Sequence, residues 1–517
     1  MKKIISLALV FFCVLTLVGC TGGDKVVTSE IFIEGDDEVV SSEKTNVNGN
    51  SSKDDKDYTD SKLTSTSSKK AVSSKEIDLL LNGNSIEKYT INCIDSGDET
   101  VLAAANKLSN EIYNLTGKRV PVGNNSNFRI NISTNESSNG LPNTYKIEFN
   151  NNNLNIIGDS SFAVIGAVDK FISQFKDAKT TKSFPKTYKL SGKVDFKKIG
   201  YNDNNLKFVG RWKENEGGVS SLWNYSSVEI SFTGNYIVAE VSASQAPGSQ
   251  VTDPCVLVTV DGGDQYSEIV ENGYLIFSFD DKTKHTIKLA GNVSNTTNFK
   301  AFYLPDNGKI SAPKSRKNIM FIGDSITHYT SCYSFLVGDI LGWDYSVVAQ
   351  AGMSLQNGEG WYKGGIEKTG METCFFKNES AAYTTELTDY NFKYTSAPDV
   401  VVIYLGTNDY TKATDKSALN KFTETYSNFV GAIRKKFPNC TIYMMESVSA
   451  KADLKKRVTA IVDAAYNRIS NEYKNVKLIK SSAWDIEGQE DGIHPTSEGS
   501  KVFAKNVAEV IKNTYGK

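Results

Sequence analysis

The chain has 517 residues and an almost balanced charge, with 58 Lys and Arg residues against 60 Asp and Glu residues. This balance leaves no basic field for nucleic acid, and only 3 histidines disfavour a histidine-rich metal site. A chain of this length predicts two to four folding units.

The first 20 residues have the pattern of a targeting segment, so we exclude them from the fold. Lys2 and Lys3 precede an apolar run, Ile4 to Val18, that is too short to be a good bilayer span. The run ends in LVGC at 17–20, which resembles a bacterial lipobox. The resemblance implies cleavage before Cys20 and a lipid on its sulfur, hence a lipoprotein at the extracellular face of the cell membrane. An ordinary secretory signal with a chance cysteine is the alternative.

Residues 21–75 are rich in Ser, Thr, Lys, Asp and Asn and contain few large apolar side chains. Such a segment cannot bury enough apolar surface to fold, so we predict a disordered tether. A flexible chain of this length has an r.m.s. reach of roughly 40 Å. The tether therefore suits a domain that is held away from a membrane.

Residues 76–196 predict a small α+β accessory domain. SGDE at 96–99 is a capping box that opens a helix, and a second helix starts near Phe162. Between them, alternating apolar residues indicate a strand at 128–132 and a hairpin at 145–156. The layout resembles accessory domains that precede the catalytic domain in several glycoside-processing enzymes. A structural spacer is the alternative.

Residues 197–308 change to an alternation of period two, which indicates strands. Apolar residues alternate within 228–232, 237–241, 256–260, 275–279 and 287–289, with turn signals between the runs. Short strands at this spacing predict a β-sandwich of the jelly-roll type. His285 lies within one of these strands, so we interpret it as a sheet residue and not as a catalytic one.

Strand and helix patterns alternate over residues 317–517. The strand candidates, some of them continuous apolar runs, are 318–323, 345–349, 400–405, 441–445 and 476–479. The helix candidates are 333–341, 416–436, 452–474 and 496–513. This order predicts a parallel sheet in a three-layer α/β domain, with its chemistry at the carboxyl ends of the strands.

Four motifs fall at the expected places around that sheet. GDSIT (323–327) follows the first strand, QAG (350–352) the second and GTND (406–409) the third, while DGIHP (491–495) precedes the last helix. Each motif alone suits an ordinary turn or helix cap. Together they supply what acyl transfer needs.

Ser325 supplies a hydroxyl nucleophile, His494 a base that takes its proton and returns it to the leaving group, and Asp491 an acceptor that orients the imidazole. The candidate oxyanion donors are the backbone N–H groups of Ser325 and Gly352 and the side-chain amide of Asn408. The constellation therefore predicts a serine esterase.

With these residues in place, the chain from about 317 to 513 resembles the SGNH (GDSL) hydrolases, which use a Ser, a Gly, an Asn and a His from four such blocks. Matched residue by residue, these are Ser325, Gly352, Asn408 and His494, with Asp491 as the usual acid. The resemblance implies a flavodoxin-like fold and ester hydrolysis without a metal or other cofactor.

The sandwich that leads through PKSRKNIMFIGDSIT (313–327) resembles family 2 carbohydrate esterases, which deacetylate plant polysaccharides. FVGRW (208–212) and KHTIKLAG (284–291) are also similar to the sandwich of that family. The segment HYTSCYSF (328–335) is shorter than the family usually has, and this loop borders the expected substrate site. In some members the triad acid is absent or replaced by a backbone carbonyl, so the role of Asp491 depends on geometry.

Three further residues are candidates for substrate binding. Trp361 and Trp484 lie in irregular segments near the expected cleft, where an indole ring stacks well on a sugar ring; packing in the core is the alternative. His328 either lines the pocket or lies on an exposed loop. The widely spaced cysteines 93, 255, 332, 374 and 440 disfavour zinc and leave disulfide formation undetermined.

The leading hypothesis is hydrolysis of acetyl or other short acyl esters on a polysaccharide or oligosaccharide. An esterase of the same chemistry that acts on peptidoglycan or lipid is the second hypothesis. A non-catalytic glycan-binding protein is the third. The sequence does not specify the polysaccharide, the acyl position or the oligomeric state.

Overall fold

The computed structural model describes residues 77–94, 99–123, 126–135, 141–234, 236–249, 251–270, 273–279, 283–305, 308–409 and 415–515. The expected signal segment, Cys20 and the tether lie outside these residues, as does most of the expected capping box at 96–99. None of the helices in the described ranges is long and apolar enough to cross a membrane.

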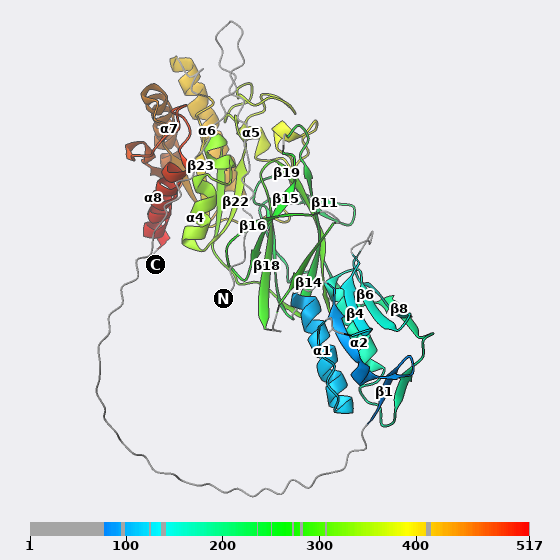
Figure 1. Cartoon of the computed structure of the whole chain (residues 1–517). Helices are drawn as coiled ribbons and strands as arrows, with labels where there is room; N and C mark the ends of the chain where they lie inside the picture. Colours follow the sequence, from blue (N-terminus) through cyan, green and yellow to red (C-terminus); the bar gives the residue numbers. More distant parts are fainter. Residues whose placement is uncertain are drawn as a thin grey trace, which may run out of the picture. The chain divides into compact units, whose positions relative to one another are not determined.

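The first described region is an α+β arrangement in which two helices pack on a five-stranded sheet (Figure 1). The strand order is β3-β4-β6-β5-β8, with β3, β4 and β6 parallel and β5 antiparallel to β6. Helix α2 starts after Ser160, whose hydroxyl accepts the Ala163 N–H at 3.1 Å as an N-cap. The elements are β1 Leu79–Leu81, β2 Asn84–Ser85, η1 Ile86–Lys88, β3 Tyr89–Cys93, α1 Glu99–Thr116, β4 Phe128–Thr134, β5 Thr144–Asn150, β6 Asn153–Gly158, α2 Ser161–Ser173, β7 Lys182–Phe184 and β8 Lys189–Lys193.

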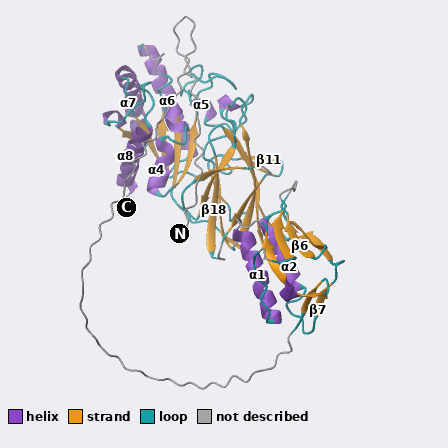
Figure 2. Ribbon diagram, viewed as in Figure 1, coloured by secondary structure: helices purple, strands orange, loops and turns teal. Residues whose placement is uncertain are grey.

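The next region consists of two antiparallel sheets that share one apolar core, and Figure 2 draws it as strands joined by loops. One sheet has the order β10-β13-β18-β15-β16 and the other β11-β12-β19-β14-β17. His285 lies in β18 with its ring stacked on Phe279, as expected for a sheet residue. The elements are β9 Phe196–Gly200, β10 Lys207–Val209, β11 Lys213–Asn215, β12 Gly218–Ser221, β13 Ser227–Thr233, β14 Tyr236–Gln245, β15 Cys255–Val260, β16 Tyr266–Ile269, β17 Tyr274–Ser278, β18 Lys284–Gly291, β19 Asn295–Pro305 and β20 Lys309–Ser311.

The C-terminal region is a five-stranded parallel sheet of order β22-β21-β23-β24-β25 with helices on both faces. Helices α6 and α7 pack together in one core cluster, and α4 and α8 pack in the other. The strands are β21 Asn318–Gly323, β22 Asp344–Ala349, β23 Val400–Tyr404, β24 Thr441–Met445 and β25 Val476–Ile479. The helices are α3 Ser325–His328, α4 Tyr333–Leu341, α5 Met371–Cys374, η2 Ala381–Tyr383, α6 Lys416–Lys436, α7 Ala452–Glu472, η3 Ser481–Ala483 and α8 Ser497–Tyr515.

The register of this sheet brings three loops to one level. Gly323, the last residue of β21, pairs with Ala349 of β22 on one side and with Tyr404 of β23 on the other. The chain crosses from one side of β21 to the other between β22 and β23, which makes this edge the topological switch point. The loops that carry Ser325, Gly352 and Asn408 therefore start side by side.

The sandwich and the α/β region are joined by buried polar contacts. Arg211 is 1% exposed, donates to the Lys377 carbonyl at 3.0 Å, and lies over the Phe375 ring at 4.6 Å. Glu229 and Asp344 lie buried on either side of the junction, and both contact the Arg316 guanidinium. These contacts bring the two regions together beside β22.

Candidate active site

Ser325 is the first residue of the short helix α3, directly after β21. Asp324 caps this helix by accepting the Ile326 N–H at 3.0 Å. A Cβ at Gly323 would lie 2.2 Å from the Thr327 hydroxyl, so the tight turn into α3 requires glycine there. The turn leaves Ser325 partly exposed at the carboxyl end of the sheet.

His494 and Asp491 lie on one loop, between η3 and α8, and the loop brings both to Ser325. The His494 Nε2 is 2.7 Å from the Ser325 Oγ, and its Nδ1 is 2.5 Å from the Asp491 Oδ2. The other oxygen of Asp491 accepts the backbone N–H groups of Ile493 and His494 at 2.8 and 3.0 Å. These three side chains therefore form one continuous hydrogen-bonded chain.

The pKa of the Asp491 carboxyl reflects two opposing causes. Partial burial raises the pKa, whereas the hydrogen bonds from the His494 ring and from the two backbone N–H groups lower it. The net result is a pKa below the usual range. An ionised carboxylate facing Nδ1 favours the tautomer in which Nε2 is free to accept the Ser325 proton.

Gly352 and Asn408 meet at a second turn. The Asn408 side-chain amide donates to the Met353 carbonyl at 2.9 Å, which places it beside the Met353–Ser354 peptide, one residue after Gly352. Gly352 has a φ of +75°, and a Cβ there would lie 2.7 Å from the Tyr362 backbone nitrogen. Only glycine fits this conformation and this close approach. The oxyanion role of the two residues remains a prediction.

Two buried carboxyl groups brace these turns. Asp409 accepts the Leu355 and Gln356 N–H groups at 2.9 and 3.0 Å, and burial raises its pKa to about 7. Burial also raises the pKa of Asp324 to about 6. Because both side chains hold backbone N–H groups, they stabilise loops and are not placed for proton transfer to substrate.

The three candidates for substrate binding occupy different environments. Trp361 is 61% exposed, and its backbone N–H donates to the Gly352 carbonyl at 2.8 Å, so an exposed indole adjoins the Gly352 turn. Trp484 is half-buried, with its ring 6.0 Å from that of Phe503. This position fits packing beneath α8 better than a sugar platform.

His328 was a candidate for substrate binding, with an exposed loop residue as the alternative, and its buried position contradicts both. The side chain is 2% exposed, and its Nδ1 lies 2.9 Å from the Ala349 carbonyl oxygen. Burial lowers its pKa to about 4, so the ring is neutral at pH 7. His328 follows a turn that is covered by the sandwich, which the sequence pattern did not indicate.

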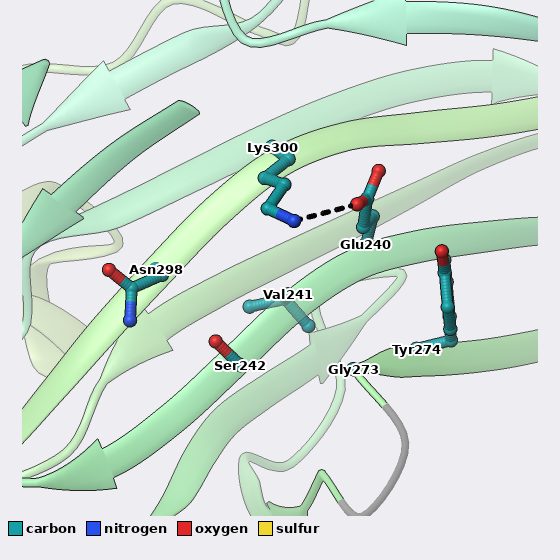
Figure 3. A pocket seen from close by; sticks show the side chains of 7 residues that line it. All are labelled: Glu240, Val241, Ser242, Gly273, Tyr274, Asn298 and Lys300. Carbon is teal, nitrogen blue, oxygen red and sulfur yellow. Dashed lines mark hydrogen bonds and ion pairs between the residues drawn. The ribbon is translucent and has the colours of Figure 1, made fainter. Parts of the chain in front are cut away.

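A separate pocket of about 240 Å³ lies on the sandwich, and none of the predicted site residues lines it (Figure 3). Lys300 and Glu240 form an ion pair of 3.1 Å in it, and the Tyr303 hydroxyl donates to the same carboxylate. These contacts already satisfy Glu240, so we assign the pocket no part in ester chemistry. Its lining residues are Glu240, Val241, Ser242, Gly273, Tyr274, Asn298 and Lys300.

Sequence reasoning missed one residue next to the site, Asn224 of the sandwich, whose side chain reaches the end of α3. It lies in a turn, and no periodicity marks it. Within the described ranges, no three His, Cys, Asp or Glu side chains are grouped to hold a metal ion. The cysteines at 255, 332, 374 and 440 are buried thiols.

Residues 321–502 match the model of the GDSL-like lipase/acylhydrolase family. No curated protein sequence matches the chain. A family two carbohydrate esterase from Cellvibrio japonicus is 16% identical, with a TM-score of 0.51, and the match covers 62% of this chain and 98% of that one.

An acetyl xylan esterase, Est2A, from the rumen bacterium Butyrivibrio proteoclasticus is 15% identical with a TM-score of 0.49, over 62% of this chain and 99% of that one. At 16% identity and a TM-score of 0.51, the Cellvibrio japonicus structure shows a shared fold. The resemblance to SGNH hydrolases is thus confirmed for the C-terminal region. The chain therefore carries a GDSL-like lipase/acylhydrolase domain over residues 321–502 and is a carboxylic ester hydrolase.

Proposed function

We propose that this chain removes acetyl or other short acyl groups from carbohydrates through an acyl-Ser325 intermediate. The observation that carries the proposal is the chain of hydrogen bonds from Ser325 through His494 to Asp491, with distances of 2.7 and 2.5 Å. A hydroxyl, a base and an orienting carboxylate in this order are what acyl transfer to serine needs. The same chain argues against a purely glycan-binding protein.

In the first half-reaction the Ser325 Oγ attacks the acyl carbon while its proton passes to the His494 Nε2. The developing oxyanion is stabilised by the backbone N–H groups of Ser325 and Gly352 and by the Asn408 amide. His494 then donates the proton to the leaving alcohol oxygen, and the acyl group stays on Oγ. In the second half-reaction His494 takes a proton from water while the water oxygen attacks the acyl carbon. The bond between the acyl carbon and Oγ then breaks, the free acid leaves, and His494 returns the proton to Oγ.

A carbohydrate substrate is supported by the exposed Trp361 beside the Gly352 turn, because an indole ring stacks on the apolar face of a sugar. The Cellvibrio japonicus protein that shares this fold is named a carbohydrate esterase, and we carry that substrate class to this chain as a proposal. We propose the finer fold assignment on the same basis, namely a flavodoxin-like three-layer catalytic domain that follows a jelly roll.

We also propose that Cys20 carries a lipid and that residues 21–75 tether the enzyme to the extracellular face of the membrane. This part rests on the lipobox-like LVGC and on the polar composition of the tether. An enzyme held there meets polysaccharides outside the cell.

The test is hydrolysis of 4-nitrophenyl acetate by residues 76–517 and by the same chain with Ser325→Ala. The substitution should lower turnover on the order of 10⁶-fold, since it removes the nucleophile. Equal rates of 4-nitrophenyl acetate hydrolysis by the two proteins would contradict the proposal. Acetate release from acetylated xylan or mannan, compared with release from peptidoglycan, then separates the two substrate classes.

A further inference from the structure

One loop of the sandwich enters the catalytic region. It joins β12 to β13, and its residues Trp223, Asn224 and Tyr225 are all buried. Trp223 belongs to a core cluster of the α/β region, and the Tyr225 ring stacks on that of Tyr345 with a centroid distance of 4.1 Å. Packing on both sides therefore fixes the position of Asn224.

Asn224 contacts the end of the helix that bears the nucleophile and the strand beside that helix. Its side-chain amide donates to the His328 carbonyl at 2.8 Å, and its Nδ2 is 2.9 Å from the His328 Nδ1. Its own carbonyl accepts the Val347 N–H of β22 at 3.4 Å. A single residue of the sandwich thus contacts the last residue of α3 and the neighbouring strand.

The His328 ring continues this connection to the second catalytic turn. Its Nδ1 lies 2.9 Å from the carbonyl oxygen of Ala349, three residues before Gly352. That oxygen only accepts, so the contact is a hydrogen bond when Nδ1 carries the proton. In that tautomer Asn224 is bonded to His328 through the His328 carbonyl and not through the ring nitrogen. Asn224, His328 and Ala349 therefore link the helix of Ser325 to the turn of Gly352.

The short helix needs such support. Helix α3 has 4 residues, which is a single turn, and one turn of helix does not stabilise itself. The amide of Asn224 satisfies a carbonyl at its C-terminal end, where an α-helix leaves carbonyls unpaired. Without this contact, the position of α3 relative to β22 depends on the side chains around it alone.

We infer that Asn224 is a positioning residue for the esterase reaction: it holds α3 against the Ala349–Gly352 turn and thereby sets the separation of the Ser325 Oγ from the Gly352 N–H. This inference rests on the proposed function. The β-sandwich is then a part of the catalytic unit, although it supplies no group that reacts. A misplacement of about 1 Å at such a site costs on the order of 10²-fold in rate.

The experiment compares the full chain with its Asn224→Ala and His328→Phe variants. The second variant keeps a ring in the same space and removes its polar contacts. Ser396→Ala is the matched control, because the Ser396 hydroxyl also donates across the junction, to the Phe208 carbonyl at 2.7 Å, but near the amino end of β23. Each protein is labelled with a fluorophosphonate, and intact mass gives both the rate constant and the final fraction of Ser325 modified.

Asn224→Ala and His328→Phe should label to the same final fraction as the unmodified chain, with a rate constant lowered roughly 10- to 100-fold. The kcat for 4-nitrophenyl acetate should fall in parallel, while KM changes much less. Ser396→Ala should keep both rates within about two-fold of the parent, as expected for a hydrogen bond away from the site.

A merely structural role predicts a different pattern, in which the final labelled fraction falls and the rate constant of the labelled molecules does not. That result overturns the inference, as does an unchanged rate in both variants. If the unmodified chain neither labels nor hydrolyses the ester, the proposed function fails and the inference falls with it. The two failures are therefore distinguishable by the behaviour of the unmodified chain.

Discussion

The sandwich contacts its two neighbours through surfaces of different chemistry. Toward the α+β region the contact is aromatic, with Phe162 stacked on Phe196 and Tyr236 at centroid distances of 4.2 and 4.1 Å. Toward the α/β region it includes buried polar and charged groups, among them Arg211 and Asn224. Both surfaces bury apolar area. The first includes a hydrogen bond from the Phe162 backbone N–H to the Tyr236 hydroxyl at 3.2 Å, whereas the second buries charged and polar side chains.

The difference shows which regions act together. Stacked rings tolerate small shifts, since offset arrangements of similar energy are available. A buried polar network has one geometry that satisfies its members, and any other leaves groups without partners. The sandwich thus contacts the α/β region through buried side-chain hydrogen bonds and ion pairs, and the α+β region mainly through stacked aromatic rings.

The largest effect should come from Arg211→Ala. The substitution leaves a cavity among Trp223, Phe375, Tyr390 and Phe392 and removes the donor to the Lys377 carbonyl. We expect the free energy of unfolding to fall by about 3–5 kcal/mol, as for other large side chains removed from a core. Urea denaturation measures it. A loss below about 1 kcal/mol would mean that the junction does not depend on this residue.

The next effect concerns pH and His328. The pKa of the ring is about 4 in the folded chain and 6.5 ordinarily, because burial disfavours the charged form. As pH falls, the unfolded chain therefore binds a proton at this ring before the folded chain does. The contribution of the neutral His328 ring to the free energy of unfolding is complete above pH 6.5 and is lost toward pH 4. The loss is roughly 3 kcal/mol.

Urea denaturation at pH 7 and pH 4 should show this loss in the parent chain but not in His328→Phe. Burial raises the pKa values of Asp324 and Asp409 in both proteins. Their contributions to the pH dependence of stability therefore cancel when the two proteins are compared. Parallel pH dependence in the two proteins would contradict a buried neutral ring at this position.

The smallest effect is expected at the aromatic contact. Phe162→Leu removes the stacking on Phe196 and Tyr236 but keeps an apolar side chain, so we expect a loss of about 1 kcal/mol in stability. The kcat and KM for 4-nitrophenyl acetate should not change. A change in kcat beyond two-fold would show that the α+β region also positions the site, against the division drawn above.

Strong periodic signals predicted the elements of the catalytic region well. The expected helices at 333–341, 416–436, 452–474 and 496–513 correspond to α4, α6, α7 and α8, with ends within two residues. Amphipathic helices and continuous apolar strands both leave long local patterns.

Two strands of the sandwich were not predicted. Strand β19 begins with polar residues, Asn295 to Asn298, and the edge strand β16 is exposed along its whole length, so neither shows the alternation of a half-buried strand.

The candidate site was predictable in part for a different reason. A parallel sheet brings the residues after its strands to one edge, so motif order alone indicated that the regions of Ser325, Gly352 and Asn408 would meet. The contacts of Ser325, His494 and Asp491 agree with that expectation, and their catalytic roles remain predictions. Contacts across the junction, such as Asn224 to His328, join positions 104 residues apart and leave no local pattern.

The hydrogen bond from the Trp361 N–H to the Gly352 carbonyl has a consequence for how this enzyme changes under selection. Trp361, which we propose as a sugar-stacking residue, and the turn expected to stabilise the oxyanion share one loop, and Gly352 accepts no side chain without strain. If both proposals hold, a substitution in this loop that alters the contact with sugar also shifts the turn expected to bind the oxyanion. Variants selected in the laboratory for a new substrate through changes in this loop should therefore have a lower kcat. Variants that gain substrate contacts on other loops should keep the kcat of the parent.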